Sequence, residues 1–235
     1  MGIEVAIMQP TYLPWIGYLA MVDRVDRFIY LDSVQFARRS WQQRNRIKSA
    51  HGELMLTVPV ISKGRRDQLI SETEVLWADG FGPKHARAIE TAYRQAPFFE
   101  KYFNDLKAAL LKEQPSLADF TIGLIEFLCG AFNIVTPRIR SSSLGVEGQK
   151  ASLLASICKE VGASSYLSAP GSQEYIEESD AFERASVSVR YHRYKHPEYP
   201  QGKGAFLPYM AAIDLLFHCG GDEGLKVLRQ GVELP

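Results

Sequence analysis

The sequence predicts an α/β fold with a Rossmann-like, mostly parallel sheet covered by helices, and three observations support this. Short apolar runs without alternation, such as residues 4–8 and 28–31, are typical of strands buried on both faces. These runs alternate with stretches of helical periodicity, as in βαβ units. A long helical stretch from Pro83 interrupts the alternation, which indicates a helical block inserted in the middle.

The individual elements follow from local patterns. We expect strands at residues 4–8, 28–31, 54–61, 138–143, 165–168 and 187–194, and a short one near 74–76. We expect helices at 18–24, 148–161 and 208–218, and two or three packed helices between 83 and 135, interrupted near Pro97 and Pro115. Residues 33–53 show no clear period. The predicted domains are therefore a discontinuous α/β sheet domain, 1–82 and 136–235, and a helical insert or subdomain, 83–135.

Composition excludes several classes of protein. The 235 residues carry 27 basic and 27 acidic side chains, and this balance argues against a general polyanion binder. The 3 cysteines form no CxxC motif or Cys/His cluster, so we expect neither a disulfide framework nor a metal site. We also expect no signal peptide, no membrane span and no cofactor, and a cytoplasmic location; the oligomeric state stays open.

The first candidate site segment is Gln9-Pro10-Thr11-Tyr12-Leu13-Pro14-Trp15-Ile16-Gly17-Tyr18, which follows the first strand. Ligands of parallel α/β sheets bind outside the carboxyl ends of the strands. Tyr12, Trp15 and Tyr18 offer flat faces, and Gly17 allows close approach of the backbone. The alternative is that the aromatic rings only cover the sheet edge. Two prolines stiffen the loop, which favours a binding role.

A second candidate segment begins at Asp32, the end of the second predicted strand. The polar side chains that follow are Gln35, Trp41, Arg44, Asn45 and Arg46. Either arginine could hold a carboxylate or phosphate in bidentate fashion. A solvated basic loop is an equally good interpretation of any single arginine.

Two later segments complete the predicted site. The turn Ser168-Ala169-Pro170-Gly171-Ser172, with Tyr175 after it, could bind an anion through backbone N–H groups, or could be a tight turn with a serine cap. The loop 191–206 supplies His196, Tyr199 and Gln201. We expect Asp32 or His196 to remove a proton from an acceptor, and Gln9 or Asn45 to polarise a carbonyl group.

Several of these motifs resemble one known family. The stretches IMQPTYLPWIGY, FIYLDSVQF and SWQQRNRIK are similar to the opening of WbqC-like proteins, and GASSYLSAPGSQEYI, YKHPEYPQ and IDLLFHCG are similar to later blocks. The matching positions are Gln9, Pro10, Pro14, Trp15, Gly17, Tyr18, Asp32, Gln35, Trp41, Arg44, Asn45 and Arg46. Met8, Gln43 and His218 depart from the pattern. The resemblance implies a small-molecule role in bacterial surface-polysaccharide or natural-product biosynthesis.

A looser likeness concerns PWIGY, which resembles the HxGH loop of nucleotidyltransferases without its two histidines. The expected function is a transferase acting on a small activated substrate, anionic and of the acyl, aminoacyl or nucleotide-sugar kind. The alternative is a non-catalytic nucleotide- or glycan-binding protein with a degenerate nucleotidyltransferase-like fold. Nucleic-acid binding through RRSWQQRNRIK is a third possibility, which the neutral net charge disfavours.

Overall fold

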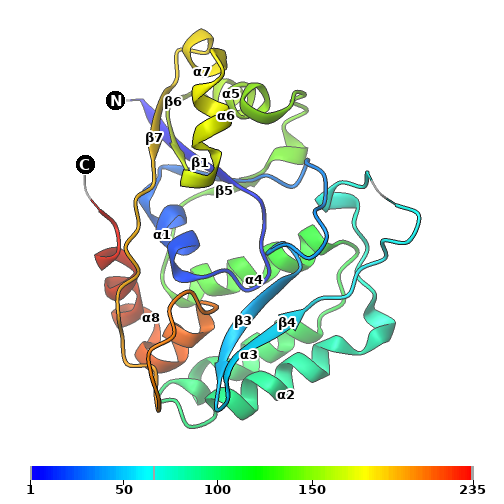
Figure 1. Ribbon diagram of the computed structural model, residues 1–235, viewed down its shortest axis with the longest axis vertical. Helices are drawn as coiled ribbons and strands as arrows, with labels where there is room; N and C mark the ends of the chain where they lie inside the picture. Colours follow the sequence, from blue (N-terminus) through cyan, green and yellow to red (C-terminus); the bar gives the residue numbers. More distant parts are fainter. Residues whose placement is uncertain (1, 66, 234–235) are drawn as a thin grey trace.

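The computed structural model describes residues 2–65 and 67–233 and contains a five-stranded parallel sheet, whose labelled strands lie in the upper half of the view in Figure 1. Its strands are β1 (Ile3–Met8), β2 (Arg27–Tyr30), β5 (Arg138–Arg140), β6 (Ala163–Ser168) and β7 (Ser188–Tyr191). They lie in the order β5-β2-β1-β6-β7. This is the Rossmann order, in which the chain builds outward from β1 first on one side and then on the other. The predicted fold class is confirmed.

Helices cover both faces of this sheet, as the unbroken apolar runs of the strands predict. Ala6, Phe28 and Leu167 point into the larger core, which they share with α1 (Ile16–Arg24), α4 (Leu117–Ala131) and α8 (Ile213–Gln230). Their neighbours Val5, Ile29 and Tyr166 point the other way, into a second core formed with α5 (Lys150–Glu160), α6 (Gln173–Glu177) and α7 (Ala181–Arg184).

A separate antiparallel hairpin, β3 (Arg44–Ser49) and β4 (Gly52–Thr57), lies beside α2 (Phe81–Tyr93), and α2 in turn packs on α3 (Phe99–Leu111) (Figure 1). The sequence does not predict β3, because the polar stretch RNRIKS gives no sign that Asn45, Ile47 and Lys48 are buried. The third expected strand, 54–61, is therefore the second half of a hairpin and ends at Thr57.

The predicted helical block is made of α2, α3 and α4. The side chains of Ile89, Leu106 and Leu124 from these three helices are buried in the same core as one face of the sheet. The division into a sheet domain and a helical insert stays a prediction. The shared core does not favour it, because the two predicted parts do not have separate cores.

The last helix differs from its prediction at both ends. It begins at Ile213 and continues to Gln230, past a break at Gly220, which has φ 73° and ψ −178°. A Cβ atom at Gly220 would lie 2.9 Å from the ring of Phe98, so the close packing of that ring needs glycine there. The predicted helix ended at His218, whereas the observed helix continues past Gly220 with a kink there.

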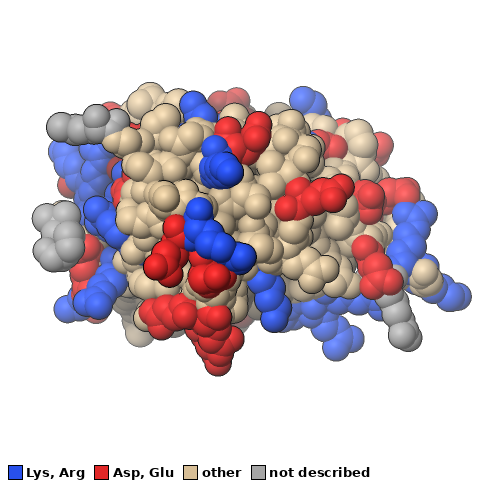
Figure 2. Space-filling model, turned by 90° about the horizontal axis from the view of Figure 1, so that it is seen from above, with Lys and Arg blue, Asp and Glu red and all other residues tan. Residues whose placement is uncertain are grey.

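Charges of both signs alternate over the face shown in Figure 2 and form no single large basic patch there. In the described part of the chain, no helix is both long and apolar enough to cross a membrane.

Candidate functional site

A cleft lies at the carboxyl ends of β1 and β6, where the strand order reverses. Ligands of open parallel sheets bind in the crevice at this point. The cleft has two compartments, a larger one of about 420 Å³ and a smaller one of about 270 Å³. Met8, Thr11 and Trp41 line both, so the two compartments adjoin.

The larger compartment carries neutral polar groups and aromatic rings. Its lining residues are Ile7, Met8, Gln9, Thr11, Leu31, Ser40, Trp41, Gln42, Leu154, Tyr166, Ala169, Ser172 and Tyr175. Gln42 Nε2 donates to Gln9 Oε1 at 2.8 Å, which fixes the orientation of both amides. Gln9 Nε2 is then the amide donor left to a ligand. The predicted site residues Gln9, Trp41, Ser172 and Tyr175 meet here.

The smaller compartment brings together another group of predicted residues. Its lining residues are Met8, Thr11, Pro14, Trp15, Tyr18, Trp41, Asn45, Arg46 and Tyr209. Trp41 is 50% exposed, and the Arg46 guanidinium carbon lies 5.7 Å from the centre of its ring. Arg46 also pairs with both carboxylate oxygens of Glu53, at 3.0 and 2.8 Å. Trp41 and Arg46 therefore form one wall of the smaller compartment, with a flat ring beside a guanidinium group.

The loop between β1 and α1 is held at three points along its backbone. Tyr12 N donates to Trp41 O at 3.0 Å, Asn45 Nδ2 donates to Leu13 O at 2.7 Å, and Ala212 N donates to Pro14 O at 2.8 Å. Leu13 has φ 44°, a left-handed conformation that costs free energy for a non-glycine residue. The buried amide of Asn45 therefore positions this loop. This hydrogen bond gives the amide a structural role within an otherwise basic segment.

Tyr12 and Gly17 have roles that differ from those expected. Tyr12 is fully buried, and its hydroxyl is hydrogen-bonded to Nδ1 of His85 at 2.7 Å, so its ring faces the core. A Cβ atom at Gly17 would lie 2.2 Å from Cη2 of Trp15. The missing side chain of Gly17 thus makes room for the Trp15 indole, and the wall of the cleft depends on it.

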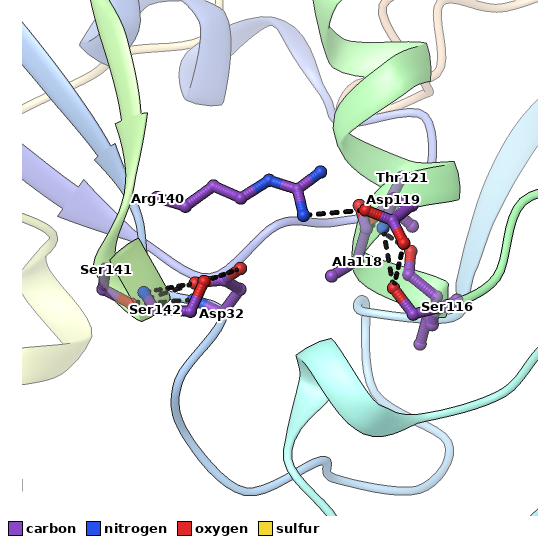
Figure 3. Close-up of polar contacts among 9 residues, drawn as sticks. Asp32, Ser116, Ala118, Asp119, Thr121, Arg140, Ser141 and Ser142 are labelled. Atoms are coloured by element: carbon purple, nitrogen blue, oxygen red, sulfur yellow. Dashed lines mark hydrogen bonds and ion pairs between the residues drawn. The ribbon is translucent and has the colours of Figure 1, made fainter. Parts of the chain in front are cut away.

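Asp32 has a supporting position at the end of β2 (Figure 3). Its carboxylate is fully buried and accepts hydrogen bonds from Ser141 Oγ at 3.1 Å, Ser142 N at 2.9 Å and Ser142 Oγ at 2.8 Å. These bonds hold the turn after β5. Asp32 lines neither compartment. Its predicted role as proton acceptor stays a prediction, which these contacts do not favour.

A second polar contact lies beside Asp32. Arg140 extends from the end of β5 to the first turn of α4, where its Nη1 lies 2.7 Å from Asp119 Oδ1 (Figure 3). Burial opposes ionisation of Asp119, but hydrogen bonds from Ser116 and Arg140 leave its pKa lowered. This ion pair ties the edge of the sheet to the helical block.

His196 lies behind the smaller compartment. Its ring stacks on Trp15 at 6.1 Å and meets Tyr209 edge-on at 5.1 Å between ring centres. Burial lowers its pKa, and its Nε2 is buried without a hydrogen-bond partner. A neutral imidazole can accept a proton, but His196 lines neither compartment, whereas Trp15 and Tyr209, which it contacts, line the smaller one. Its catalytic role also stays a prediction.

Other predicted site residues lie outside both compartments: Tyr12, Gly17, Gln35, Arg44, Ser168, Gly171, Tyr199 and Gln201. Gln35 is exposed and donates to Asp67 Oδ1 at 3.2 Å. Gln201 bonds the backbone N–H and carbonyl groups of Leu207, at 2.8 and 2.9 Å, and so closes its own loop. Ser168 is fully buried, and its carbonyl accepts from His192 N at 2.8 Å.

The cleft also contains polar residues that were not predicted: Thr11, Ser40, Gln42, Tyr166 and Tyr209. Thr11, Ser40 and Gln42 lie within the two segments that the sequence singled out, so position relative to a strand end is a signal that could have found them. Tyr166 lies inside β6, and no signal distinguishes it from a core residue. Among the residues described, none form a group of three or more side chains suited to hold a metal ion.

The strand order and the cleft define an α/β protein of the Rossmann-like class with a crevice at the topological switch point. The chain belongs to the WbqC-like protein family, whose pattern matches residues 9–225. A Mycobacterium tuberculosis protein described as "uncharacterized protein Rv1507c" is 34% identical over 231 residues, which is 97% of this chain and 99% of that protein. No solved structure matches the chain. The family resemblance predicted from the sequence is confirmed.

Proposed function

We propose that the protein is a transferase that takes a small activated donor of the nucleotide-sugar kind in the two-compartment cleft. The observation that carries this proposal is the position of the cleft at the switch point of a Rossmann-ordered sheet. The family resemblance supports a place in bacterial surface-polysaccharide or natural-product biosynthesis. The three free cysteines are compatible with a reducing compartment, which supports a cytoplasmic location.

The chemistry of the larger compartment suits a sugar or a nucleoside. Among its described lining residues no side chain is an acid, an amine, a guanidinium or an imidazole. Amides and hydroxyls such as Gln9 and Ser172 can bond to the hydroxyl groups of a sugar, and Trp41 offers a ring face for stacking. Such a neutral surface binds a neutral, hydroxyl-bearing group without burying an unpaired charge.

The smaller compartment suits the anionic part of the same donor. Arg46 is the cation among the described residues that line it, and it stands next to Trp41 at the boundary with the larger compartment. A phosphate there would compete with Glu53 for the guanidinium. A donor could therefore place its neutral ring group in the larger compartment and its charged linkage in the smaller one.

A non-catalytic binding protein is the second candidate, and one observation favours it. Of the three residues predicted to be catalytic, Gln9 lines the cleft, whereas Asp32 and His196 do not. Catalysis by Gln9 would depend on orientation and on hydrogen bonding to a developing charge. A binding protein needs only the recognition surface.

The test is a thermal-shift screen with nucleotide sugars, free nucleotides and acyl-thioesters at equal ionic strength. We expect a nucleotide sugar to raise Tm, and Gln9→Ala and Trp41→Ala to weaken its binding by about 10-fold or more, roughly 1.4 kcal/mol. Gln230→Ala, on the exposed end of α8, is the matched control.

The outcomes separate the candidates. Release of free nucleotide on addition of acceptors supports the transferase. Stabilisation without any product supports the binding protein. Equal binding by the Gln9→Ala, Trp41→Ala and Gln230→Ala proteins would remove the cleft from both proposals.

A further inference from the structure

A second cavity, of about 410 Å³, lies apart from the cleft and shares no lining residue with it. It is lined by the end of β3, by the end of α2 and its connection to α3, by residues 201–203 and by His218 of α8. Its charged or titratable lining residues are Lys48, Tyr93, Arg94, Lys203 and His218. Among the described residues that line it there is no carboxylate, and we call it the basic cavity.

Lys48 is the most informative residue of the basic cavity. It is only 9% exposed, and its Nζ donates to the carbonyl oxygens of Gln201 at 3.2 Å and Ala205 at 2.9 Å. No carboxylate in the described part of the chain pairs with it. Buried ammonium groups are expected to have an anionic partner, because carbonyl dipoles offset only part of the cost of burial. The third N–H of Lys48 is left for such a partner.

His218 presents a second polar atom to the same space. Its Nδ1 donates to the carbonyl oxygen of Asp214 at 2.9 Å, which puts the ring proton on Nδ1. Its Nε2 faces Gly202, where a Cβ atom would lie 3.1 Å away. Since Gly202 has no side chain, Nε2 stays accessible to a ligand, either as acceptor from a phosphate hydroxyl or, when protonated, as donor.

A buried acid, Asp214, lies behind the basic cavity, where its Oδ1 accepts no hydrogen bond from the described residues and is 3.8 Å from Nδ1 of His218. Asp214 is fully buried, and its Oδ2 accepts from the Tyr93 hydroxyl at 2.8 Å. The same hydroxyl accepts from Lys48 N at 3.0 Å. Tyr93 therefore stands between the carboxylate and the cavity and holds the Lys48 backbone in place.

We propose that the basic cavity binds a small phosphorylated molecule through its phosphate group. Lys48 is the buried anchor, and Arg94 and Lys203 are exposed cations at the mouth. Guanidinium and ammonium donors around one space are the arrangement that phosphate oxygens accept from. The site is independent of the cleft, so it can serve as a second substrate site or as a site for an effector.

Calorimetric titration with sodium pyrophosphate, inorganic phosphate, ribose 5-phosphate and citrate, each against sodium chloride of equal ionic strength, tests the proposal. The double variant Arg94→Ala/Lys203→Ala alters exposed side chains and so keeps the fold. We expect it to weaken binding of the best phosphate compound by about 10-fold or more, and Lys48→Met to weaken it further. Lys159→Ala, an exposed lysine of α5, should leave the affinity within about twofold of the parent.

The arms of the experiment identify the source of the phosphate. Tightest binding of ribose 5-phosphate assigns a phosphate ester, and tightest binding of pyrophosphate assigns a diphosphate. No binding above the sodium chloride reference, equal affinity in the double variant, or preference for citrate overturns the proposal. Gln9→Ala and Trp41→Ala should leave this binding intact, so failure here and failure of the cleft are distinguishable.

Discussion

At the scale of single residues, the position of Asp32 in the sequence suggests a catalytic role, whereas its contacts in the structure indicate a structural one. An aspartate at a strand end is typical of active sites in parallel sheets. Here the turn after β5 uses both carboxylate oxygens, through Ser141 and Ser142. We therefore expect the main contribution of Asp32 to be to the stability of the folded protein.

Replacing Asp32 with Asn should lower the free energy of unfolding by about 2 kcal/mol, because hydrogen bonds to a charged acceptor are lost or weakened. Urea unfolding measures this change. Asp105→Asn, on an exposed face of α3, should have little effect. A variant with unchanged stability but no turnover would restore Asp32 as a catalytic residue.

His85 makes the stability depend on pH. Burial lowers its pKa to about 4, and Lys84 adds to this effect. The unfolded chain therefore binds a proton below about pH 6.5 that the folded chain does not. Stability is complete above pH 6.5 and falls as the pH drops towards 4, by an amount on the order of 2 kcal/mol.

His192, whose pKa burial also lowers to about 4, adds to the same trend. His85→Gln keeps a polar side chain near the Tyr12 hydroxyl and removes one titration. We expect its free energy of unfolding to change less between pH 6.5 and 4 than that of the parent, as measured by urea unfolding at several pH values. Identical pH profiles would show that His85 ionises freely in the folded protein.

At the scale of elements, the loop from β1 to α1 depends on a glycine inside the helix. Gly17→Ala places a methyl group within 2.2 Å of the Trp15 ring, so the indole must leave the wall of the smaller compartment. We expect a loss of about 1–3 kcal/mol in stability and weaker binding of the cleft ligand, measured by melting temperature and titration.

Gly123→Ala in α4 is the matched control, because a Cβ atom there meets nothing within 4 Å. It should be neutral or stabilising by about 0.5–1 kcal/mol. If Gly17→Ala behaves like Gly123→Ala, the Trp15 ring has another position open to it.

The strands differ in how well the sequence predicts them. The strands β1 and β2 were predictable because each is an apolar run between turn residues, and β6, with the sequence ASSYLS, because it lies between Gly162 and the turn Ala169-Pro170-Gly171. β3 was not, since Lys48 and Asn45 are buried in it through hydrogen bonds to distant carbonyl groups of Ala205 and Leu13. The strand-end rule located Gln9, Trp41 and Ser172, but it could not show that Asp32 is bonded to a turn over 100 residues further along the chain.

At the scale of the whole molecule, the larger core joins the sheet, the hairpin and the helical block. Ile47 of β3, Ile125 of α4 and Phe28 of β2 are all fully buried within it. A core shared in this way couples the parts energetically, so none is expected to unfold alone.

We therefore expect one cooperative urea transition, with coincident curves from tryptophan fluorescence and far-UV circular dichroism. Ile125→Ala, in the helical block, should shift both curves together by about 2–5 kcal/mol. Loss of the dichroism signal at lower urea than the fluorescence change would indicate that residues 83–135 form an independent subdomain.

The two outer strands of the parallel sheet are short, three residues in β5 and four in β7. Each carries arginine, and Arg138, Arg140 and Arg190 form ion pairs with Glu126, Asp119 and Glu4. A neighbouring chain would find few free backbone groups in register, flanked by charged side chains. Both edge strands of the sheet therefore disfavour pairing with a strand of another molecule, which is a route to aggregation.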